Sequence, residues 1–362
     1  MLYQDRIPIP MTFGEVNAEW ITAVFAQHHP GICAQTVAQV DEMIGACVKL
    51  RIAIDWNAAG RSAALPSTVI VKGNFGRQGP ELDFMFEDEM RSYRDVLSQM
   101  NLNVPACYHA GGRGGRTILV LEDLATPDCT FGTVARPLSF TEATLVLDQL
   151  AALHARYWDD SELADHGSLA WISQSLSTDH FAFICRILEP DRWRHYLELP
   201  RGVAAPRATA GDPARLLSAF LAQQAFHRTA PQTLCHGDAH GANNYFNRNG
   251  GGLFDWALRR APWFYDISYF IAGTLDVVDR RNWEWALLQY YLGRLNALGV
   301  TPPSFEEAVY AYRRELIYGY VLMIGNGEID AYWNEAANTA AATRFAMAAE
   351  DHAMLAAIES GE

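Results

Sequence analysis

The chain has 362 residues, of which 50% are hydrophobic and 19% are charged. This composition is typical of a folded globular protein and excludes wholesale disorder. The formal net charge is -14, which disfavours a nucleic-acid partner and electrostatic binding to an anionic membrane. No apolar run reaches the roughly 18 residues that span a bilayer, and the first residues do not resemble a secretion signal. We therefore expect a cytoplasmic protein with neither a membrane nor a nucleic acid as partner.

The rarer residue types carry further information. The six cysteines are scattered without a CxxC pair, which favours free thiols in a reducing compartment. Among the 28 basic residues, only Lys49 and Lys72 are lysines. A sequence that uses arginine almost everywhere keeps lysine where a compact ammonium group is needed. Both lysines are therefore candidate functional cations, although strand alternation predicts a solvent-facing side chain for Lys49.

The first 124 residues have the patterns of a small sheet with helices. Apolar and other residues alternate over 48–54, which predicts a half-buried strand. The patterns also predict strands at 68–72 and 117–121, helices at 15–28 and 81–100, and a turn at 57–60. We take residues 1–124 as an N-terminal domain, with a hinge at 121–125.

The remainder, residues 125–362, reads as mainly helical. Ser139 and Ser304 each precede a glutamate by three residues, which predicts a capping box at the start of a helix. The alanine-rich stretch 334–358 predicts one more helix, and the proline and glycine residues at 200–213 indicate an exposed loop. The chain as a whole is therefore expected to be an α+β protein, with a small sheet domain followed by a larger helical one.

Residues 234–256 differ from the rest of the helical part, because their pattern predicts short strands. This segment also carries the polar residues of greatest interest. Asn249-Gly250 is a hairpin turn signal between two short apolar pieces. A hairpin here would bring Asn243, before its first strand, beside Asp255, after its second. Amide and carboxylate oxygens suit Mg²⁺. Asp238 lies in the preceding loop, where a carboxylate can accept the proton of an attacking hydroxyl group.

This segment, His-Gly-Asp-x-His-x-x-Asn followed by an apolar residue, Asp and Trp, resembles the catalytic and metal motifs of the aminoglycoside phosphotransferase and choline kinase-like family. Further similarities occur in the expected order along the chain, at 69–72, 89–93, 121–124, 153–158 and 263–270. That family has the bilobal protein-kinase-like fold. The resemblance therefore implies a kinase that uses ATP and Mg²⁺ and phosphorylates a hydroxyl group of a small molecule.

The resemblance also implies roles for single residues in the catalytic segment. Asp238 would orient or deprotonate the substrate hydroxyl, and Asn243 and Asp255 would hold Mg²⁺ on the ATP phosphates. Because phosphoryl transfer needs little covalent help, positioning and charge neutralisation would carry most of the catalysis.

In the N-terminal domain, the resemblance implies that Lys72, paired with Glu89, holds the α- and β-phosphates. The backbone from Glu122 to Leu124 would contact adenine. One departure concerns the Gly-rich loop that covers the phosphates in kinase-like folds. The matching stretch, 42–47, has a single glycine, Gly45, which leaves that loop short.

Two further polar residues are expected to have structural roles. His236 is expected to shape the catalytic loop by hydrogen bonding, and Asp266 is expected to anchor backbone near it. The many aromatic residues after 155 are expected mostly in the core and between helices.

Two other functions remain open at this point. In an extended segment His236, Asp238 and His240 would point the same way and could bind Zn²⁺ or Mn²⁺, as in a metallohydrolase. The reduced Gly-rich loop would also suit a protein that binds a nucleotide without catalysis. For a kinase, the aromatic-rich helical part favours an apolar alcohol as acceptor. Residues of about 160–232 are expected to shape the pocket that binds it. A cleft lined by carboxylates would favour a cationic acceptor instead.

Overall fold

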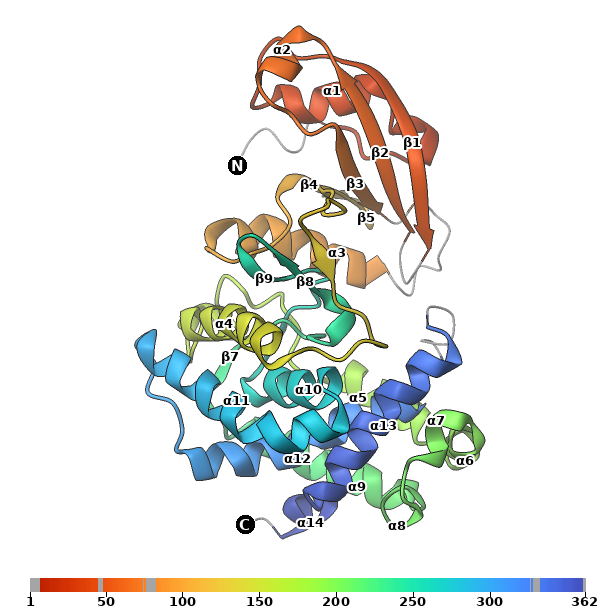
Figure 1. Ribbon diagram of the computed structural model, residues 1–362, viewed down its shortest axis with the longest axis vertical. Helices are drawn as coiled ribbons and strands as arrows, with labels where there is room; N and C mark the ends of the chain where they lie inside the picture. The colour runs from red at the N-terminus through yellow and green to blue at the C-terminus, as the bar shows by residue number, and fades with distance from the viewer. Residues whose placement is uncertain are drawn as a thin grey trace. The chain divides into compact units, whose positions relative to one another are not determined.

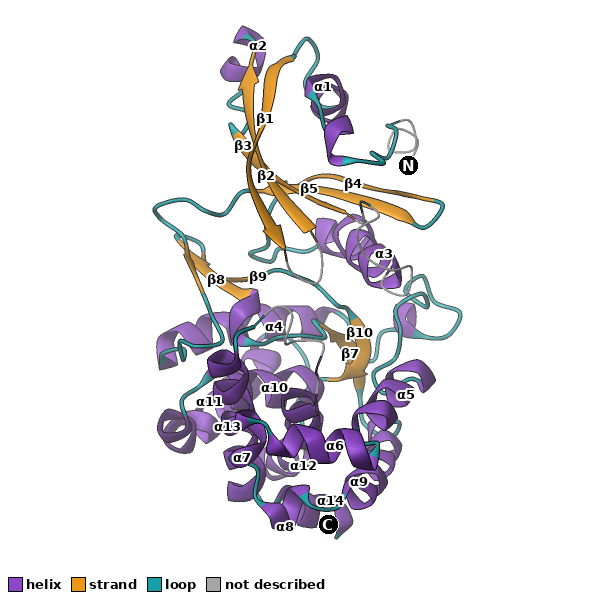
Figure 2. Ribbon diagram, turned by 90° about the vertical axis from the view of Figure 1, so that its right-hand side faces the viewer, coloured by secondary structure: helices purple, strands orange, loops and turns teal. Residues whose placement is uncertain are grey.

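The computed structural model describes residues 7–44, 48–73, 75, 83–325, 327 and 333–360. The chain forms two compact units, Met1–Cys129 and Thr130–Glu362 (Figure 1). An antiparallel sheet dominates the first unit and helices dominate the second (Figure 2), so the expected α+β class is confirmed. Within the described ranges, no helix combines the length and apolar character needed to cross a bilayer.

The first unit is built on a five-stranded antiparallel sheet with the strand order β1-β2-β3-β5-β4. Its strands are β1 (Ala34–Ile44), β2 (Val48–Trp56), β3 (Thr68–Gly73), β4 (Cys107–Arg113) and β5 (Arg116–Glu122). Its helices are α1 (Ala18–Ala26), α2 (Ala58–Ser62) and α3 (Asp83–Arg91), with short helical turns at Phe13–Glu15, Ser92–Val96 and Leu97–Gln99.

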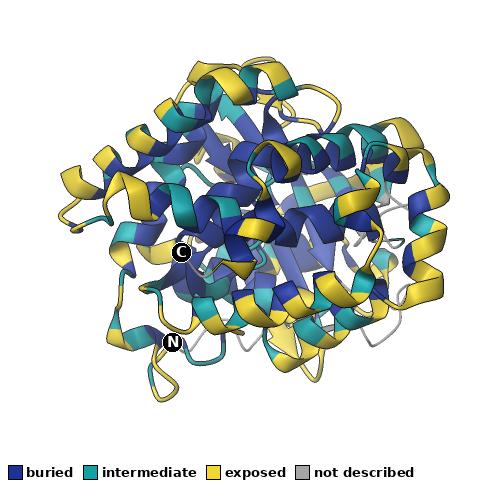
Figure 3. Ribbon diagram, turned by 90° about the horizontal axis from the view of Figure 1, so that it is seen from below, coloured by how far each residue is buried: buried dark blue, intermediate teal, exposed yellow. Residues whose placement is uncertain are grey.

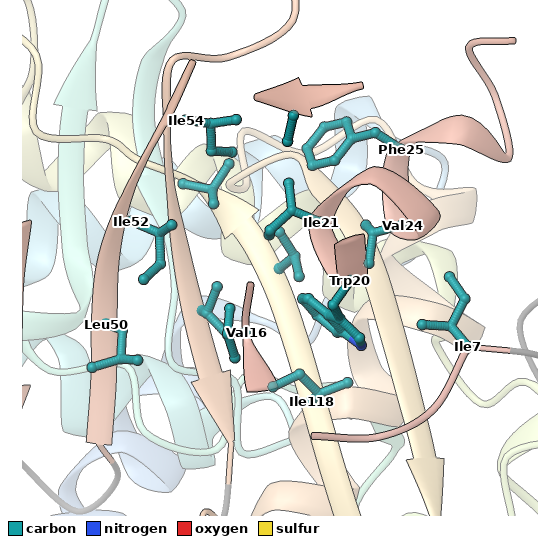
Figure 4. Close-up of a cluster of buried hydrophobic side chains, with 14 of the residues drawn as sticks. Ile7, Val16, Trp20, Ile21, Val24, Phe25, Leu50, Ile52, Ile54 and Ile118 are labelled. Carbon is teal, nitrogen blue, oxygen red and sulfur yellow. The ribbon is translucent and has the colours of Figure 1, made fainter. Parts of the chain in front are cut away.

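One face of this sheet is covered by α1. Trp20, Ile21 and Phe25 of α1 lie in one buried cluster with Leu50 and Ile52 of β2 (Figure 4). Burying such side chains contributes about 1.5 to 3 kcal/mol each, so this cluster is a main source of the unit's stability. Because side chains alternate along a strand, the residues of β2 between these apolar ones face the other side of the sheet.

The first unit differs from the sequence predictions in three places. Strands β1 and β4 were not anticipated. The helix expected over 81–100 is regular only to Arg91, and a π-helical turn and a 3₁₀ turn follow it. The turn expected at 57–60 begins the short helix α2 instead, because the side chain of Asn57 accepts a hydrogen bond from the backbone N–H of Gly60 and caps the helix.

The second unit contains the other helices and three small sets of strands. Its helices are α4 (Phe140–Arg156), α5 (Thr178–Ile187), α6 (Pro190–Glu198), α7 (Pro200–Val203), α8 (Arg207–Ala210), α9 (Pro213–His227), α10 (Phe264–Thr274), α11 (Val277–Ala297), α12 (Phe305–Gly325), α13 (Glu335–Asp351) and α14 (Met354–Glu359), with short turns at Ser161–Leu163 and Gly241–Asn243. Its strands are β6 (Thr130–Phe131), β7 (Gln232–Cys235), β8 (Asn244–Asn247), β9 (Gly250–Leu253) and β10 (Arg259–Pro262).

The core of the second unit is built around two of these helices. Every residue of α10 is buried, and α12 is buried over most of its length. Helix α12 packs against both α10 and α13, and α4 packs against α11. Figure 3 shows buried segments of the chain beside helical turns that are exposed. Strands β7 and β10 pair with each other, and α10 follows β10 directly. The segment between the two strands is therefore anchored to the core at both ends.

Several predictions for the second unit can be checked. The capping boxes at Ser139 and Ser304 are both present. The terminal helix expected at 334–358 is broken into α13 and α14 by Ala353, which has a left-handed backbone conformation. The expected exposed loop at 200–213 contains α7 and α8 instead, with Arg201 buried. There Pro200 starts a helix, because the first helical position needs no backbone N–H.

Candidate active site

The expected hairpin is present in the second unit. Strands β8 and β9 pair in antiparallel register, from Asn244 opposite Leu253 to Asn247 opposite Gly250. The two-residue turn is therefore Arg248-Asn249, one position earlier than the sequence indicated. Asn243 lies immediately before β8, and its backbone carbonyl accepts a hydrogen bond from the N–H of Phe254. Asp255 follows Phe254, so the open end of the hairpin carries both predicted metal-binding residues.

Asn243 is tied directly to Asp238. Its Nδ2 donates to the backbone carbonyl of Asp238 at 2.9 Å and to the carboxylate Oδ2 at 3.1 Å. Both amide hydrogens of Asn243 are thus in use, and no described residue donates to its Oδ1. The amide is therefore oriented with an unused oxygen acceptor, which is the atom that a hard cation would need.

His240 lies between the acidic residues of this loop. Its Nε2 lies 3.4 Å from the Asp238 Oδ2. Burial lowers the pKa of His240, but the carboxylates of Asp238 and Asp255 raise it more, so the net pKa lies above the usual value. Burial raises the pKa of Asp238, but His240 lowers it more, and the net pKa lies below the usual value. Asp238 is therefore an ionised carboxylate at neutral pH, and its side chain is 40% exposed.

The backbone at residues 236 and 237 needs a specific local geometry. Gly237 has a φ of +90°, and a Cβ at this position would lie 1.9 Å from the carbonyl oxygen of Ala257. Glycine is thus required both by its conformation and by the close approach of another backbone segment. The ring of fully buried His236 is within hydrogen-bond distance of the Phe254 carbonyl through Nε2 and accepts from the Asp238 N–H through Nδ1. The predicted loop-shaping role of His236 agrees with these contacts.

The backbone at residues 236 and 237 is held by Asp266 of α10. This buried carboxylate accepts the N–H of His236 at 2.6 Å and the N–H of Gly237 at 3.0 Å. The Nε2 of His154 in α4 lies 3.1 Å from the same carboxylate, and its Nδ1 lies 2.7 Å from the Tyr291 hydroxyl. The anchoring of backbone expected of Asp266 is thus visible as a buried network from three helices.

This network must be distinguished from a metal site. Among the described residues, His154, Cys235 and Asp266 form the one group of three potential ligands whose atoms lie within 4.8 Å of one another. Both ring nitrogens of His154 already have partners, and Asp266 already accepts two backbone N–H groups. The group therefore positions the loop through hydrogen bonds, which satisfy its buried polar atoms.

The alternative metal site at His236, Asp238 and His240 is not formed. The segment is not an extended strand, and these three side chains do not converge. The ring nitrogens of His236 have protein partners, and the Nδ1 of His240 accepts the Ala242 N–H. Gly237, between His236 and Asp238, has a φ of +90° and turns the backbone, so the spacing of i, i+2 and i+4 does not place these side chains on one face.

In the first unit, the structure pairs Lys72 of β3 with Glu89 of α3. The Nζ of Lys72 lies 2.5 Å from the Glu89 Oε2, and both side chains are 7% exposed. Glu87 and Asp88 on the same helix were competing candidates for this contact. The helix turns Glu87 into solvent, whereas it buries Glu89 against the sheet.

Residues 122–124, at the end of β5, are held by contacts within the first unit. The carboxylate of Glu122 accepts the backbone N–H of Ala106, and Leu124 is largely buried. Between them, Asp123 forms an ion pair with Arg51 of β2 at 3.0 Å, a contact that the sequence analysis missed. Only the tertiary pairing of β2 with β3 and of β3 with β5 reveals it, because 72 positions separate the two residues. Gly45 lies outside the described residues.

Aromatic rings that the sequence analysis did not single out lie near Asp238 and His240 in the second unit. Tyr269 of α10 and Tyr318 of α12 have ring centroids 5.5 Å apart, and His180 of α5 lies 5.4 Å from Tyr318. Burial and the charge of Asp238 hold the pKa of Tyr269 well above its usual value. Trp333 lies 5.2 Å from the ring of His240. The only sequence signal for this surface was the number of aromatic residues after 155.

Comparison with known families supports the similarity noted from the motifs. Residues 40–157, which are less than half of the chain, match the sequence model of the ecdysteroid kinase-like family, EcKL. None of the curated proteins with which the sequence was compared matches it.

Solved structures of similar fold span almost the whole chain. The choline kinase LicA from Streptococcus pneumoniae has a TM-score of 0.50 at 12% identity, with 92% of this chain and 98% of that chain covered. An ethanolamine kinase from Plasmodium vivax gives 0.49 at 11% identity, with 88% and 81% covered. An aminoglycoside phosphotransferase from Streptomyces rimosus, in complex with ADP and streptomycin, gives 0.46 at 14%, with 81% and 95% covered. The chain thus has the protein-kinase-like fold predicted from its sequence.

Proposed function

We propose that this protein is a small-molecule kinase that transfers the γ-phosphoryl group of ATP to a substrate hydroxyl, with Mg²⁺. The observation that carries the proposal is the loop in which Asp238 is ionised, bonded to Asn243 and held by Asp266. This is a carboxylate whose position is fixed through its own backbone while its side chain stays accessible.

The proposed reaction assigns one proton acceptor. The acceptor hydroxyl attacks the γ-phosphorus, the new O–P bond forms, the bond between the γ-phosphorus and the β,γ-bridging oxygen breaks, and ADP leaves. The hydroxyl proton passes to Asp238. A carboxylate with a lowered pKa is a weak base, which suits a loose transition state in which the hydroxyl loses its proton late. Orienting the hydroxyl is then the larger contribution of Asp238.

The donor atoms fit a magnesium ion. Asn243 offers its unused Oδ1 and Asp255 offers a carboxylate, which are hard oxygen ligands. Mg²⁺ would neutralise charge on the phosphate oxygens when bound. His240, beside both carboxylates, limits their mutual repulsion before the ion binds.

Nucleotide binding is assigned to the N-terminal unit. Lys72 would contact the α- and β-phosphates, and its ion pair with Glu89 fixes the direction of the ammonium group. The backbone of 122–124 would contact adenine. Arg51 and Asp123 stabilise this segment by joining it to β2.

For the acceptor, the residues near Asp238 favour an uncharged alcohol with an apolar face. Tyr269, Tyr318 and Trp333 are aromatic, and the nearby basic residue Arg259 adds to burial in lowering the pKa of His180 to about 4. Arg259 disfavours an ammonium group beside His180, whereas a neutral alcohol can pack against the partly exposed ring of Trp333.

The experiment is a phosphoryl-transfer assay with ATP, Mg²⁺ and a panel of neutral and cationic alcohols. Asp238→Asn should lower the rate about 10²- to 10⁴-fold without loss of folding, as for other general bases. Asp179→Asn, at an exposed position in α5, is the matched control and should keep full activity. Full activity of Asp238→Asn would refute the assigned base, and a preference for cationic alcohols would refute the acceptor class.

The second candidate is a nucleotide-binding protein without catalysis. It is favoured by the single glycine in the stretch 42–47. Calorimetry that detects ATP binding, together with no transfer to any alcohol of the panel, would support it over the kinase. The retention of Lys72, Asp238, Asn243 and Asp255 in one chain favours the kinase.

A further inference from the structure

Helix α10 meets the loop of Asp238 with two side chains of one face. Asp266 accepts two backbone N–H groups of this loop, and Tyr269 follows Asp266 by three positions. Residues three apart lie on the same face of a helix. Burial raises the pKa of Tyr269, and the carboxylate of Asp238 raises it further, which places the two side chains close together. The phenol is therefore protonated at neutral pH and can act as a hydrogen-bond donor.

The hydroxyl of Tyr269 is buried without a hydrogen-bond partner. The residue is 4% exposed, and within the described part of the chain no group forms a hydrogen bond of normal geometry with this hydroxyl. Most buried polar groups of proteins have a partner, so an unpartnered one needs an explanation. In free enzymes, hydrogen bonds that serve catalysis are often too long or poorly aligned until the substrate binds. An unused donor beside the proposed base, Asp238, has this character.

The ring of Tyr269 is held by packing and does not depend on its hydroxyl. Its centroid lies 5.5 Å from that of Tyr318 in α12 and 5.4 Å from that of Phe345 in α13. Phe345 fits closely because Gly319 has no side chain, since a Cβ there would lie 2.1 Å from the Phe345 ring. Phenylalanine at position 269 could fill the same space, so packing alone does not explain the oxygen atom.

The carboxylate of Asp238 is held through one of its two oxygens. Its Oδ2 accepts the Nδ2 of Asn243 at 3.1 Å and lies 3.4 Å from the Nε2 of His240. No described residue donates a hydrogen bond of normal geometry to its Oδ1. A carboxylate held on one side can still turn about its bond to Cβ. A second donor would fix its plane, and orientation is the larger contribution proposed for this residue.

We propose that the Tyr269 hydroxyl donates a hydrogen bond to the Asp238 carboxylate when the acceptor is bound, and so positions it for the reaction. The inference rests on the proposed function. With Asn243 as the first donor and Tyr269 as the second, a remaining lone pair of the carboxylate is directed to the acceptor hydroxyl. Tyr269 keeps its own proton, and the proton of the acceptor still passes to Asp238. Tyr269 acts through Asp238 and is therefore a positioning residue.

A second buried tyrosine provides the matched control. Tyr320 of α12 is fully buried, and its hydroxyl also has no partner among the described residues. Burial raises the pKa of Tyr320, and the charges that also act on it are those of Glu350 and Arg207. Tyr269→Phe and Tyr320→Phe thus remove the same atom from equally dry surroundings. Only the first removes it from beside the proposed base.

The measurement is phosphoryl transfer by the full chain, with ATP, Mg²⁺ and the alcohol of the panel that reacts fastest. Tyr269→Phe should lower kcat about 10- to 100-fold, the range for one hydrogen bond to a charged group. The KM for the alcohol should change less than about twofold, because the interaction is made in the transition state. The urea-unfolding midpoint should not fall, since the free protein loses no hydrogen bond. Tyr320→Phe should match the wild type in kcat and KM.

A double-mutant cycle tests whether Tyr269 acts through Asp238. In the Asp238→Asn background, Tyr269→Phe should have little further effect on kcat, because the carboxylate that it positions is gone. An equal fold loss in both backgrounds would show that the two residues act independently, and it would overturn the inference.

The remaining outcomes separate this inference from the proposed function. If Asp238→Asn is slow and Tyr269→Phe keeps full kcat, the kinase assignment stands and the role of Tyr269 is wrong. If Tyr269→Phe unfolds, or loses only as much activity as its folded fraction explains, the hydroxyl has a structural role and the inference is also wrong. If the wild type phosphorylates none of the alcohols, the proposed function fails and the inference fails with it.

Discussion

The two units of this protein position their charged groups in different ways. In the first unit, two buried or half-buried charges are fixed by an opposite charge from a distant segment: Lys72 of β3 by Glu89 of α3, and Arg51 of β2 by Asp123. In the second unit, the backbone of the loop is fixed by Asp266, and the side chain of Asp238 remains 40% exposed.

The difference shows two solutions to one problem. A charge buried on a sheet must be paired, because desolvation without a partner is costly. A carboxylate on a loop can stay accessible to a ligand, provided that hydrogen bonds to its own backbone hold it in place. The first arrangement should therefore fail when one side chain is removed, and the second when the anchor is removed.

The largest expected effect is on the anchor of the loop. Asp266→Asn leaves the N–H groups of His236 and Gly237 and the ring of His154 without a charged acceptor. We expect a loss of about 5 kcal/mol in the free energy of unfolding, because asparagine loses the charge, keeps only one acceptor oxygen and turns an NH₂ group towards a buried donor, and hydrogen bonds to a charged group contribute about 1.5 to 3 kcal/mol each. Urea unfolding followed by tryptophan fluorescence measures it.

The matched control for this variant is Asp276→Asn, in which the side chain at the start of α11 is exposed. Aspartate and asparagine cap helices about equally well, so little change is expected. Equal stability of Asp266→Asn and Asp276→Asn would contradict the view that the loop depends on its buried anchor.

The next effect tests the buried pair of the first unit. Lys72→Met removes the ammonium partner of the buried Glu89 carboxylate and should lower the free energy of unfolding by about 3 to 5 kcal/mol. Adding Glu89→Leu should restore most of it, because the double variant buries no charge. A double-mutant cycle by urea unfolding measures the coupling.

The same cycle separates stability from function. The double variant should stay unable to bind ATP tightly although it is stable, because Lys72 is absent. If the double variant is no more stable than Lys72→Met, the two side chains are not energetically coupled. That result would contradict the view that the first unit holds Lys72 in place through its charge pair.

The smallest effect concerns pH. Burial lowers the pKa of His109 in β4 to about 4, against about 6.5 in the unfolded chain. As the pH falls from 6.5 towards 4, the unfolded chain takes up a proton and the folded chain does not. Stability is therefore full above pH 6.5 and falls as the pH drops, by about 2 to 3 kcal/mol between pH 6.5 and 4.5. Unfolding measured across this range gives the slope.

His109→Phe should remove this part of the slope, and His166→Gln, at an exposed position, should keep it. His180 in the second unit has the same lowered pKa of about 4, so it contributes to the slope that persists in His109→Phe. An unchanged slope in His109→Phe would show that this histidine is protonated in the folded chain.

Much of the local structure could be predicted from the sequence. The alternation over 48–54 marked β2, and the capping boxes marked the starts of α4 and α12. The hairpin between Asn243 and Asp255 followed from its turn signal, with an error of one residue. These features depend on contacts between residues close in sequence. The break at Ala353 and the helix α2 were missed, because single residues in special conformations or caps decide them.

The sequence by itself determined which residue types stand at which spacing: an acid, an amide and a second acid around a hairpin, and a lysine on a strand. Local sterics and hydrogen bonding suffice for this. Only the tertiary structure decided that Asp266 holds the loop and that Lys49 stands opposite Lys72. Each of these depends on the pairing or packing of distant segments, which is selected by burial of the whole core rather than by any local pattern.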